Sequence, residues 1–372
     1  MNKTKHVRDP LFHIVKRDEF PWWKSGLIRV IAVALALIVS AVVIVLCTGE
    51  NPLSIYQSMF EGAMGTSRRA WSLAQNTAIL LCISLAVTPA FCMRFWNTGA
   101  EGQALIGGLA TAFCMIQFGG KLPTPVLMIL VVLVSMAAGA IWGVIPAIFK
   151  AVWNTNETLF TLMMNYIAIQ IVSYFTYIYS VPKGSGQLGT INKSTKAGWL
   201  PTIYNNYLLN ILIVVVLTIV IYIYLKYSKH GYEISVVGQS ENTARYIGIN
   251  VRKVIIRTML ISGALCGICG LLLVAGTDHT LTRDTVAGRG FTAIMVSWMA
   301  KFNPIYMVLV SLLICFLQKG SVEIATNFGL NDSFSDIITG IIIFFIIGSE
   351  FFINYSVVRN HVSSEKREEV QA

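Results

Sequence analysis

Only a few polar residues in this 372-residue chain have the types and spacing that catalysis or metal binding requires. The run Gly119-Gly120-Lys121 has part of a phosphate-binding loop, but Leu122 stands where such a loop needs Ser or Thr. Asp332 and Asp336 are spaced to share one helix face, although capping of the apolar run that follows explains them more simply. The five histidines are scattered along the chain. The sequence therefore predicts no intrinsic enzymatic activity and no metal site.

Cysteine spacing gives one further candidate for chemistry. Cys266 and Cys269 have the spacing of a redox pair, but they lie in the segment 263–270, in which glycines recur every three or four residues. Small residues at this spacing let two membrane helices approach closely. All seven cysteines lie in or beside apolar runs. We therefore expect helix packing from this segment and no disulfide framework.

The composition identifies the elements that must position any functional residue. Apolar residues make up 55% of the chain and charged residues only 12%, whereas soluble domains carry about 25% charged residues. Apolar runs of about 20 residues, long enough to cross a ~30 Å membrane core, recur along the chain. The net charge of +10 is concentrated beside these runs, where it meets anionic lipid. The sequence predicts a membrane protein that contacts lipid and binds no nucleic acid.

Ten apolar segments predict an all-α polytopic protein with about ten transmembrane helices. The eighth segment is too short to span alone, which leaves open whether it is re-entrant. Most Lys and Arg residues fall in loops on the same side as the N-terminus, so both termini are expected in the cytoplasm. The segments are 27–47, 70–92, 101–118, 125–149, 159–181, 207–227, 255–276, 291–300, 305–318 and 334–355.

The predicted organisation has three parts. Residues 1–26 form a basic head, in which Phe20-Pro21-Trp22-Trp23 fits either an interfacial helix with an aromatic anchor or a simple topology signal. Residues 27–357 form the transmembrane domain, with a cytoplasmic loop at 228–253. Residues 358–372 form a cytoplasmic tail.

The loop 228–253 is the most informative segment. It is long, charged and able to form a short helix, which are the properties a membrane subunit needs to receive force from a soluble partner. Glycines at 231, 238 and 248 bracket the segment and permit turns at its ends. This loop also resembles the coupling loop of bacterial ABC importer permeases, in the family that handles nucleosides and simple sugars. The matching positions are Gly231, Gly238, Ala244, Gly248 and Ile249, while Thr243 replaces an alanine.

Three further stretches resemble the same family, in family order. Residues 94–103 are similar to its N-x-G-x-E-G-Q signature, and residues 156–168 to its N-E-x-x-x-T-x-M-x-N-Y-I-A stretch. Residues 290–294 match the start of its G-F-x-A-I segment, after which Ser297-Trp298-Met299 depart from the family's small and aliphatic residues. The resemblance covers roughly residues 73–347.

The resemblance implies that the chain is the permease subunit of an ATP-driven importer in a bacterial cell membrane. Nucleosides are the favoured cargo, and a simple sugar such as a pentose is the alternative. A partner ATP-binding cassette subunit would bind ATP and Mg, so no cofactor is expected on this chain. A second related permease, in a heterodimer rather than a homodimer, and an extracellular substrate-binding lipoprotein complete the implied assembly. The residues expected to couple the chain to the ATPase are Gly231, Glu233, Gly238, Gln239, Glu241, Asn242, Ala244, Arg245 and Gly248.

Candidates for the substrate pathway begin where one apolar run gives way to the next without a real loop. Asn97, Glu101 and Gln103 lie there among glycines at 99, 102, 107 and 108, which predict a broken backbone through this stretch. A broken backbone at membrane depth is tolerated only against protein or a wet cavity. Glu101 is then either a functional carboxylate or a cap on the N-terminus of a half-helix.

The remaining pathway candidates are Thr161, Asn165 and Trp298. Asn156 suits a helix N-cap with Glu157 in the first turn, which places Thr161 and Asn165 on one face of the following helix. That face either lines a pathway or hydrogen-bonds to a neighbouring helix. Trp298 either stacks on a ring of the cargo or packs in the membrane core.

Two alternative classes of protein are weaker fits. A secondary transporter or channel needs ion-linked charges within the membrane, and the predicted spans hold few, namely Glu101, Asp336 and Glu350. A membrane enzyme acting on lipid-linked substrates needs paired carboxylates or a metal cluster at an interface, for which Asp332 and Asp336 are the nearest candidates.

Overall fold

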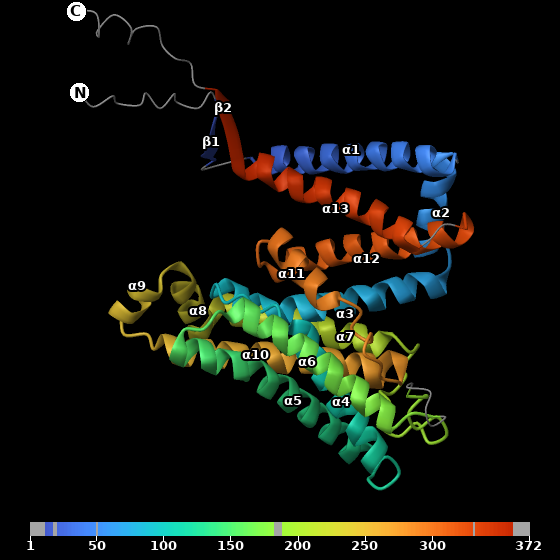
Figure 1. Cartoon of the computed structure of the whole chain (residues 1–372), viewed down its shortest axis with the longest axis vertical. Helices are drawn as coiled ribbons and strands as arrows, with labels where there is room; N and C mark the ends of the chain where they lie inside the picture. Colours follow the sequence, from blue (N-terminus) through green and yellow to red (C-terminus); the bar gives the residue numbers. More distant parts are fainter. Residues whose placement is uncertain (1–11, 18–20, 50, 182–187, 330–331, 360–372) are drawn as a thin grey trace, which may run out of the picture. The chain divides into compact units, whose positions relative to one another are not determined.

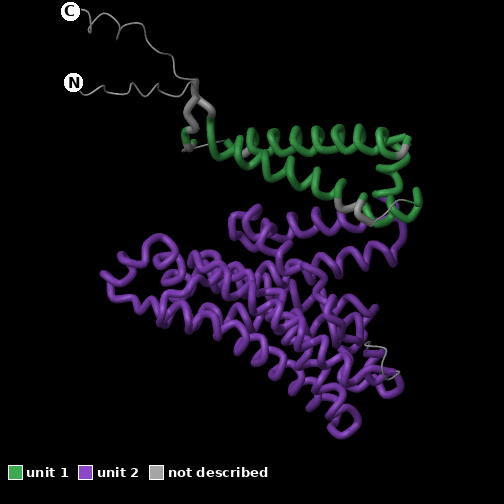
Figure 2. The backbone as a smooth tube through the Cα atoms, viewed as in Figure 1, with its two compact units in different colours: residues 1–59, 320–372 green, residues 60–319 purple. Residues whose placement is uncertain are grey.

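The computed structural model describes residues 12–17, 21–49, 51–181, 188–329 and 332–359. In this part of the chain the regular elements are helices and one two-stranded sheet (Figure 1). Eight of the described helices are long and apolar enough to cross a membrane. The prediction of an all-α polytopic membrane protein is confirmed. The chain divides into two compact units, shown in Figure 2: residues 1–59 with 320–372, and residues 60–319.

The larger unit, residues 60–319, contains every candidate site residue. Polar side chains cap several of its helices, as Thr66, Asn156 and Asn250 each accept a backbone N–H in the first turn that follows. The helices that lie wholly in this unit are α3 (Ser67–Cys92), α4 (Ala100–Phe118), α5 (Thr124–Trp153), α6 (Glu157–Ile178), α7 (Leu208–Tyr227), α8 (Lys229–Gln239), α9 (Glu241–Tyr246), α10 (Val251–Leu271), the π-helical η1 (Leu272–Asp278) and α11 (Arg289–Met299).

Helix α10, which η1 continues, forms the centre of this unit. In the most apolar membrane-spanning stretch of α10 and η1, 78% of the residues are buried, whereas only 17% are buried in the corresponding stretch of α7. The central helix packs against α3, α4 and α5. Its residues Gly263, Gly267 and Gly270 lie at these contacts, and a Cβ atom on any of them would overlap with the backbone of a neighbouring helix. The interpretation of 263–270 as a helix-packing segment is confirmed, because only glycine permits this approach.

The prediction of a broken backbone is right for one part of its segment and wrong for another. Residues 96–98 have no helical structure, and the chain turns at Arg94, which has a φ of 60°. Gly102, Gly107 and Gly108 instead lie inside the regular helix α4. A Cβ atom on Gly107 would come within 2.5 Å of the Cα atom of Gly267, so this glycine serves close packing against α10.

Helices α4 and α11 both begin within the depth of the helix bundle. Asn97, three residues before α4, hydrogen-bonds to Ser262 in the middle of α10. Arg289, the first residue of α11, donates to Asn76, ten residues into α3. An 11-residue helix spans about 16 Å, roughly half of a membrane core. The short eighth segment is therefore a half-span that follows an incoming loop.

Loops at opposite ends of the unit make separate sets of contacts. The end of α5, at Lys150, shares a groove with Glu241 and Arg245 of α9. The loop after α6 instead meets the end of η1, because Ile191 N–H donates to the His279 carbonyl over 2.8 Å. The loop 228–253 therefore shares its end of the unit with the α5–α6 connection.

The smaller unit pairs the two ends of the chain. Helix α1 (Trp22–Thr48) packs against α13 (Asp332–Asn354), and Arg29 forms an ion pair with Glu350 at 2.6 Å. Strands β1 (Phe12–Lys16) and β2 (Tyr355–Arg359) pair antiparallel. Within the predicted basic head, residues 12–16 thus form a strand, while Trp22 and Trp23 of the aromatic anchor already belong to α1. Helices α2 (Pro52–Met64) and α12 (Pro304–Asn327) cross from one unit into the other.

Candidate functional site

The loop between α7 and α10 folds into two short helices rather than one. Ser228 caps α8 by accepting the Gly231 N–H at 2.9 Å, and Ser240 ends α8 while it caps α9. Gly248, with a φ of 84°, follows α9, and Asn250 caps α10. Capping residues at each boundary fix where the helices begin because they satisfy backbone N–H groups that have no partner within the helix. We refer to residues 228–250 as the coupling loop.

One face of the coupling loop is anchored to the ends of three long helices. Ile234, Val237 and Ala244 are buried, with 0 to 3% of their surface exposed. They belong to a hydrophobic cluster separate from the main core. Its other members come from the end of α3, the turn after it, α5 and α10: Ala90, Met93, Phe95, Ala147, Val251, Val254, Ile255 and Met259. The loop is therefore packed directly against these helix ends.

Glycines make this anchored face possible. Gly238 lies against the end of α3, where a Cβ atom would overlap with the carbonyl oxygen of Cys92. Gly231 lies against the carbonyl groups of Tyr224 and Leu225 at the end of α7, where a Cβ atom would also overlap with backbone. Two of the positions predicted from the sequence as turn-forming are thus inside helix α8 and serve close approach.

An ion pair adds a polar link between the coupling loop and α10. Arg257 donates to Glu233 over 2.5 Å, and both side chains are largely shielded from solvent. The Arg257 guanidinium lowers the pKa of the Glu233 carboxyl below its ordinary value of 4.5. Glu233 is therefore ionised at neutral pH and holds α8 against α10.

The opposite face of the coupling loop is open. Gln239, Glu241, Asn242, Arg245 and Gly248 are all exposed. Beside them Tyr246 is 92% exposed and Ile247 50% exposed, although both are large apolar side chains. The list of coupling residues predicted from the sequence omitted these two. The signal in the sequence is an aromatic residue followed by an aliphatic one at the end of an otherwise polar loop, and aromatic residues are enriched at protein interfaces.

The predicted pathway residues Asn97 and Gln103 lie inside the protein. Both are buried, and their side-chain amides hydrogen-bond to each other at 3.0 and 3.3 Å. Asn97 also donates to the hydroxyl of Ser262 on α10 and accepts the N–H of Gly99. This network fixes the turn between α3 and α4 to the central helix.

Thr161 and Asn165 do share a helix face, which points at the same turn. Asn165 donates to the Thr98 carbonyl at 2.8 Å and accepts the Gly102 N–H at 2.8 Å. The hydroxyl of Thr161 is 2.9 Å from that of Thr98. Both residues are at least 98% buried. Of the two interpretations left open by the sequence, the structure shows hydrogen bonding between neighbouring segments.

Glu101 joins the starts of α4 and α11, the two helices that begin within the depth of the bundle. It lies in the first turn of α4, and its two carboxylate oxygens accept the N–H groups of Gly288 and Gly290 at 2.8 and 2.7 Å. These N–H groups belong to the N-terminus of α11. A carboxylate there is stabilised by the helix dipole and satisfies donors that have no intrahelical partner. Glu101 thus caps a half-helix, but the helix is α11 and not its own.

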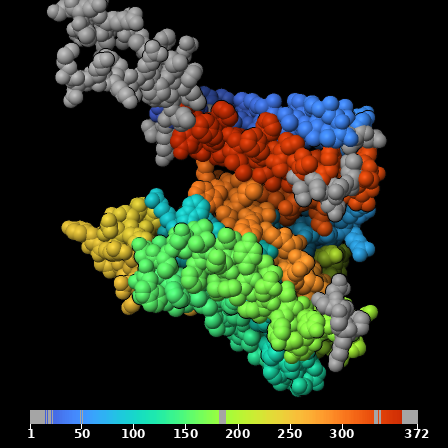
Figure 3. All heavy atoms as spheres, viewed as in Figure 1, coloured from blue at the N-terminus to red at the C-terminus, as the bar shows by residue number. Residues whose placement is uncertain are grey.

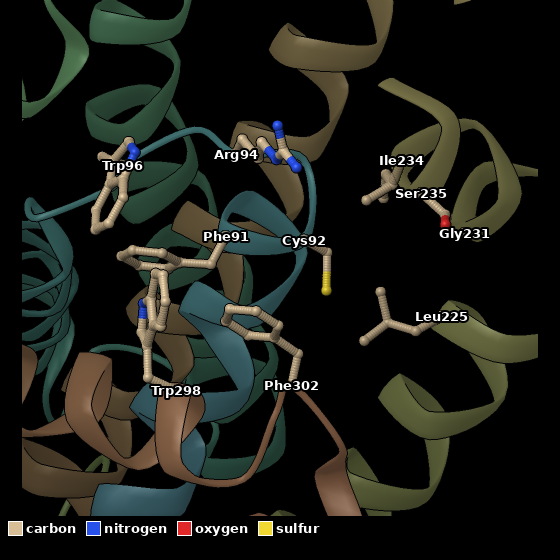
Figure 4. Close-up of a pocket in the computed structure, with 10 residues that line it drawn as sticks. All are labelled: Phe91, Cys92, Arg94, Trp96, Leu225, Gly231, Ile234, Ser235, Trp298 and Phe302. Atoms are coloured by element: carbon tan, nitrogen blue, oxygen red, sulfur yellow. The ribbon is translucent and has the colours of Figure 1, made fainter. Parts of the chain in front are cut away.

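Trp298 lines a cavity of about 450 Å³ beside the coupling loop (Figure 4). On one side the rings of Trp96 and Trp298 stack with centroids 5.4 Å apart, and Phe91 and Phe302 complete an aromatic wall. The opposite side is formed by Leu225 at the end of α7 and by α8 through Gly231, Ile234 and Ser235. Trp298 is 49% exposed, so it is available to a molecule entering this cavity.

Comparison with known proteins identifies the family to which this chain belongs. Residues 70–347 match the family described as branched-chain amino acid transport system / permease component. The chain belongs to this family. It is the non-enzymatic permease subunit of an ABC importer, it crosses the membrane several times, and its ATP is hydrolysed by a partner ATPase subunit. Family membership removes the secondary-transporter and membrane-enzyme alternatives.

Three relatives of this permease resemble it over nearly their whole lengths. The guanosine ABC transporter permease protein NupP of Bacillus subtilis is 30% identical over 87% of this chain and 93% of the relative. The nucleoside ABC transporter permease protein NupB of Lactococcus lactis is 27% identical over 87% of this chain and 91% of the relative. The glucose ABC transporter permease protein TsgB13 of Haloferax volcanii is 26% identical over 92% of each chain. No solved structure matches the chain.

Proposed function

We propose that this permease imports nucleosides. The observation that carries the proposal is its similarity to NupP and NupB, whose names give guanosine and nucleosides as their cargo, over 87% of the chain. The aromatic cavity beside the coupling loop supports it, since the faces of Trp96 and Trp298 suit a flat, partly polar ring. The chain supplies the passage, while ATP and Mg are bound by the partner ATPase.

The proposed assembly contains a second, different permease. The chain is similar to both NupP and NupQ of Bacillus subtilis, but at 30% identity over 329 residues for the first and 25% over 236 residues for the second. The same holds for NupB and NupC of Lactococcus lactis. We assign this chain the role of the NupP-like and NupB-like subunit, in a heterodimer with a NupQ-like partner. An extracellular substrate-binding lipoprotein delivers the cargo.

The coupling loop transmits the work of the ATPase. Its exposed face, from Gln239 to Gly248, docks on the ATPase, and its anchored face moves with the ends of α3, α5 and α10 through the cluster around Ile234 and Val237. Because α8 also forms one wall of the aromatic cavity, the same motion changes the width of that cavity. ATP-driven motion is thereby converted into opening and closing of the passage.

The test is uptake of labelled nucleosides and labelled pentoses by cells that express the chain with its neighbouring permease, ATPase and lipoprotein. We expect nucleoside uptake that disappears when the ATPase is replaced by a hydrolysis-deficient variant. Pentose uptake without nucleoside uptake would reject the proposed cargo. A simple sugar is the second candidate because TsgB13, a permease named for glucose, is 26% identical over 353 residues.

A further inference from the structure

Helix α6 carries a polar stripe on its outer face. Tyr166, Gln170 and Tyr174 are exposed and follow one another at intervals of four residues, with the two tyrosines 64% and 69% exposed. Residues four apart on a helix lie on one face, about 6 Å apart along the axis. Together with Ile167 and Ile171 they line an open groove of about 480 Å³. We call Tyr166, Gln170 and Tyr174 the α6 stripe.

The exposed faces of two other spans, α5 and α7, show how a lipid-facing surface looks in this protein. Between Leu212 and Ile223 the exposed large residues of α7 are all aliphatic, namely Leu212, Val215, Val216, Ile219, Val220 and Ile223. Those in the first two thirds of α5 are also aliphatic, namely Val126, Ile129, Leu133 and Ile141. Helix α6 is likewise apolar and long enough to cross the membrane, yet its outer face presents hydroxyl and amide groups.

The position of Gln170 excludes a lipid environment for this face. Gln170 is the fourteenth residue of a 22-residue helix, so it lies well inside the span. Aromatic residues anchor in lipid headgroups at the ends of a span, and on this face Tyr177 lies next to such an end. No group in the described part of the chain hydrogen-bonds to the Gln170 side-chain amide. An amide without a partner in hydrocarbon costs several kcal/mol. The stripe must therefore meet water, cargo or protein.

The shape of the stripe argues against a helix packed directly on it. Close contacts between membrane helices use small residues, as this protein does at Gly107, Gly139 and Gly267. The exposed positions of α6 instead hold Met163, Tyr166, Ile167, Gln170, Ile171 and Tyr174, between which the groove stays open. Figure 3 shows that α6, in green, lies on the surface of its unit.

We infer that the α6 stripe lines the cargo passage, and that Gln170 recognises the cargo. Its amide offers two donors and one acceptor, which match the hydrogen-bonding edge of a planar heterocycle, and the Tyr166 and Tyr174 rings provide faces on either side of that amide. Helix α6 also adjoins the aromatic cavity, since Thr161 near its start contacts the Trp96 carbonyl at 3.4 Å. The cargo class named here rests on the proposed function, whereas the inference that the α6 stripe lines a water-filled passage does not.

Thiol labelling tests the passage independently of the cargo. Gln170→Cys and, as the matched control on the lipid-facing helix, Ile219→Cys are made in a chain in which the exposed Cys47 and the partly exposed Cys92, which lines the aromatic cavity, are replaced by Ser. Both are treated, in the assembled transporter, with a charged methanethiosulfonate reagent that reacts only in water. We expect modification at position 170 and none at 219. Equal labelling of the two positions, or none at 170, overturns the inference.

Uptake measurements then test recognition. Gln170→Leu keeps the size of the side chain and removes its hydrogen bonds, so we expect KM to rise about tenfold with Gln170→Asn intermediate. Ile219→Leu should leave uptake unchanged. Co-purification of the ATPase and second permease with Gln170→Leu must equal that of the wild type; its loss would make the stripe a subunit contact and overturn the inference. If the wild type imports a pentose instead of nucleosides, the proposed cargo is wrong. The thiol-labelling result then still tests whether the α6 stripe lines a water-filled passage.

Discussion

The two faces of the coupling loop differ sharply in how much of their surface is buried. One face, with Ile234, Val237 and Gly238, is packed without space against the ends of long helices. The other, with Arg245 and Tyr246, touches little of its own chain. The contrast teaches that a loop which transmits force needs rigid attachment on one side and an unoccupied surface on the other. Substitutions on the two faces should therefore fail in different ways.

The largest effect is expected from filling the space at Gly238. Gly238→Leu forces a side chain into the carbonyl of Cys92, so α8 must separate from α3. The spans still insert, because their hydrophobicity is unchanged, but ATP-dependent uptake is lost and the purified chain unfolds at lower temperature. Gly348→Leu is the control, since a Cβ atom there meets nothing within 4 Å. Normal uptake by Gly238→Leu would show that the anchored face does not transmit force.

The next effect concerns the exposed face. The double variant Tyr246→Ala with Ile247→Ala removes two exposed apolar side chains, so the stability of the isolated chain should not change. Interface aromatic residues often contribute about 2 kcal/mol or more to binding, so we expect at least about tenfold weaker binding of the ATPase and a matching loss of uptake. Pull-down of the ATPase measures this. Tyr204→Ala, which removes an 80% exposed tyrosine outside the coupling loop, should bind the ATPase like wild type.

A charge reversal sharpens the same comparison without removing surface. Glu241 and Arg245 form an exposed pair at 3.1 Å, which contributes little to stability. The double variant Glu241→Arg with Arg245→Glu keeps the ion pair but exchanges the positions of the positive and negative charges that face the ATPase. We expect unchanged thermal unfolding and more ATP hydrolysed for each cargo molecule imported. Uptake and hydrolysis in the wild-type ratio would remove these charges from the docking surface.

The smallest effect is expected at the ion pair behind the loop. Because Arg257 lowers the pKa of Glu233, the pair stabilises the folded chain above the ordinary pKa of 4.5, and this contribution is lost as the pH falls through the lowered value. Glu233→Gln should therefore be less stable than wild type at pH 7 by on the order of 1 kcal/mol. Thermal unfolding from pH 7 to pH 3 should show the difference shrinking below about pH 4.5. A difference that is constant across this range would mean that the pair does not stabilise the loop.

Features that depend only on neighbouring residues could be predicted from the sequence. Asn156 caps α6 as its spacing predicted, accepting the Leu159 N–H at 3.1 Å, because a cap depends only on neighbouring residues. Glu101 was correctly anticipated as a possible cap of a half-helix, but its partner α11 lies 187 residues away along the chain. Gly107 and Gly108 were misread as a break because a glycine that permits helix packing looks the same in sequence as one that ends a helix.

The sequence by itself determined that this chain crosses a membrane many times and that a long polar loop at 228–253 separates two of the spans, because hydrophobicity and charge act residue by residue. The sequence motifs also placed it in its family before any contact was known. Only the tertiary structure decided which face of that loop is free, that β1 pairs with β2, and that α6, unlike α5 and α7, presents an amide outward. These features depend on which distant segments pack together, and packing buries one side of a helix while leaving its composition unchanged.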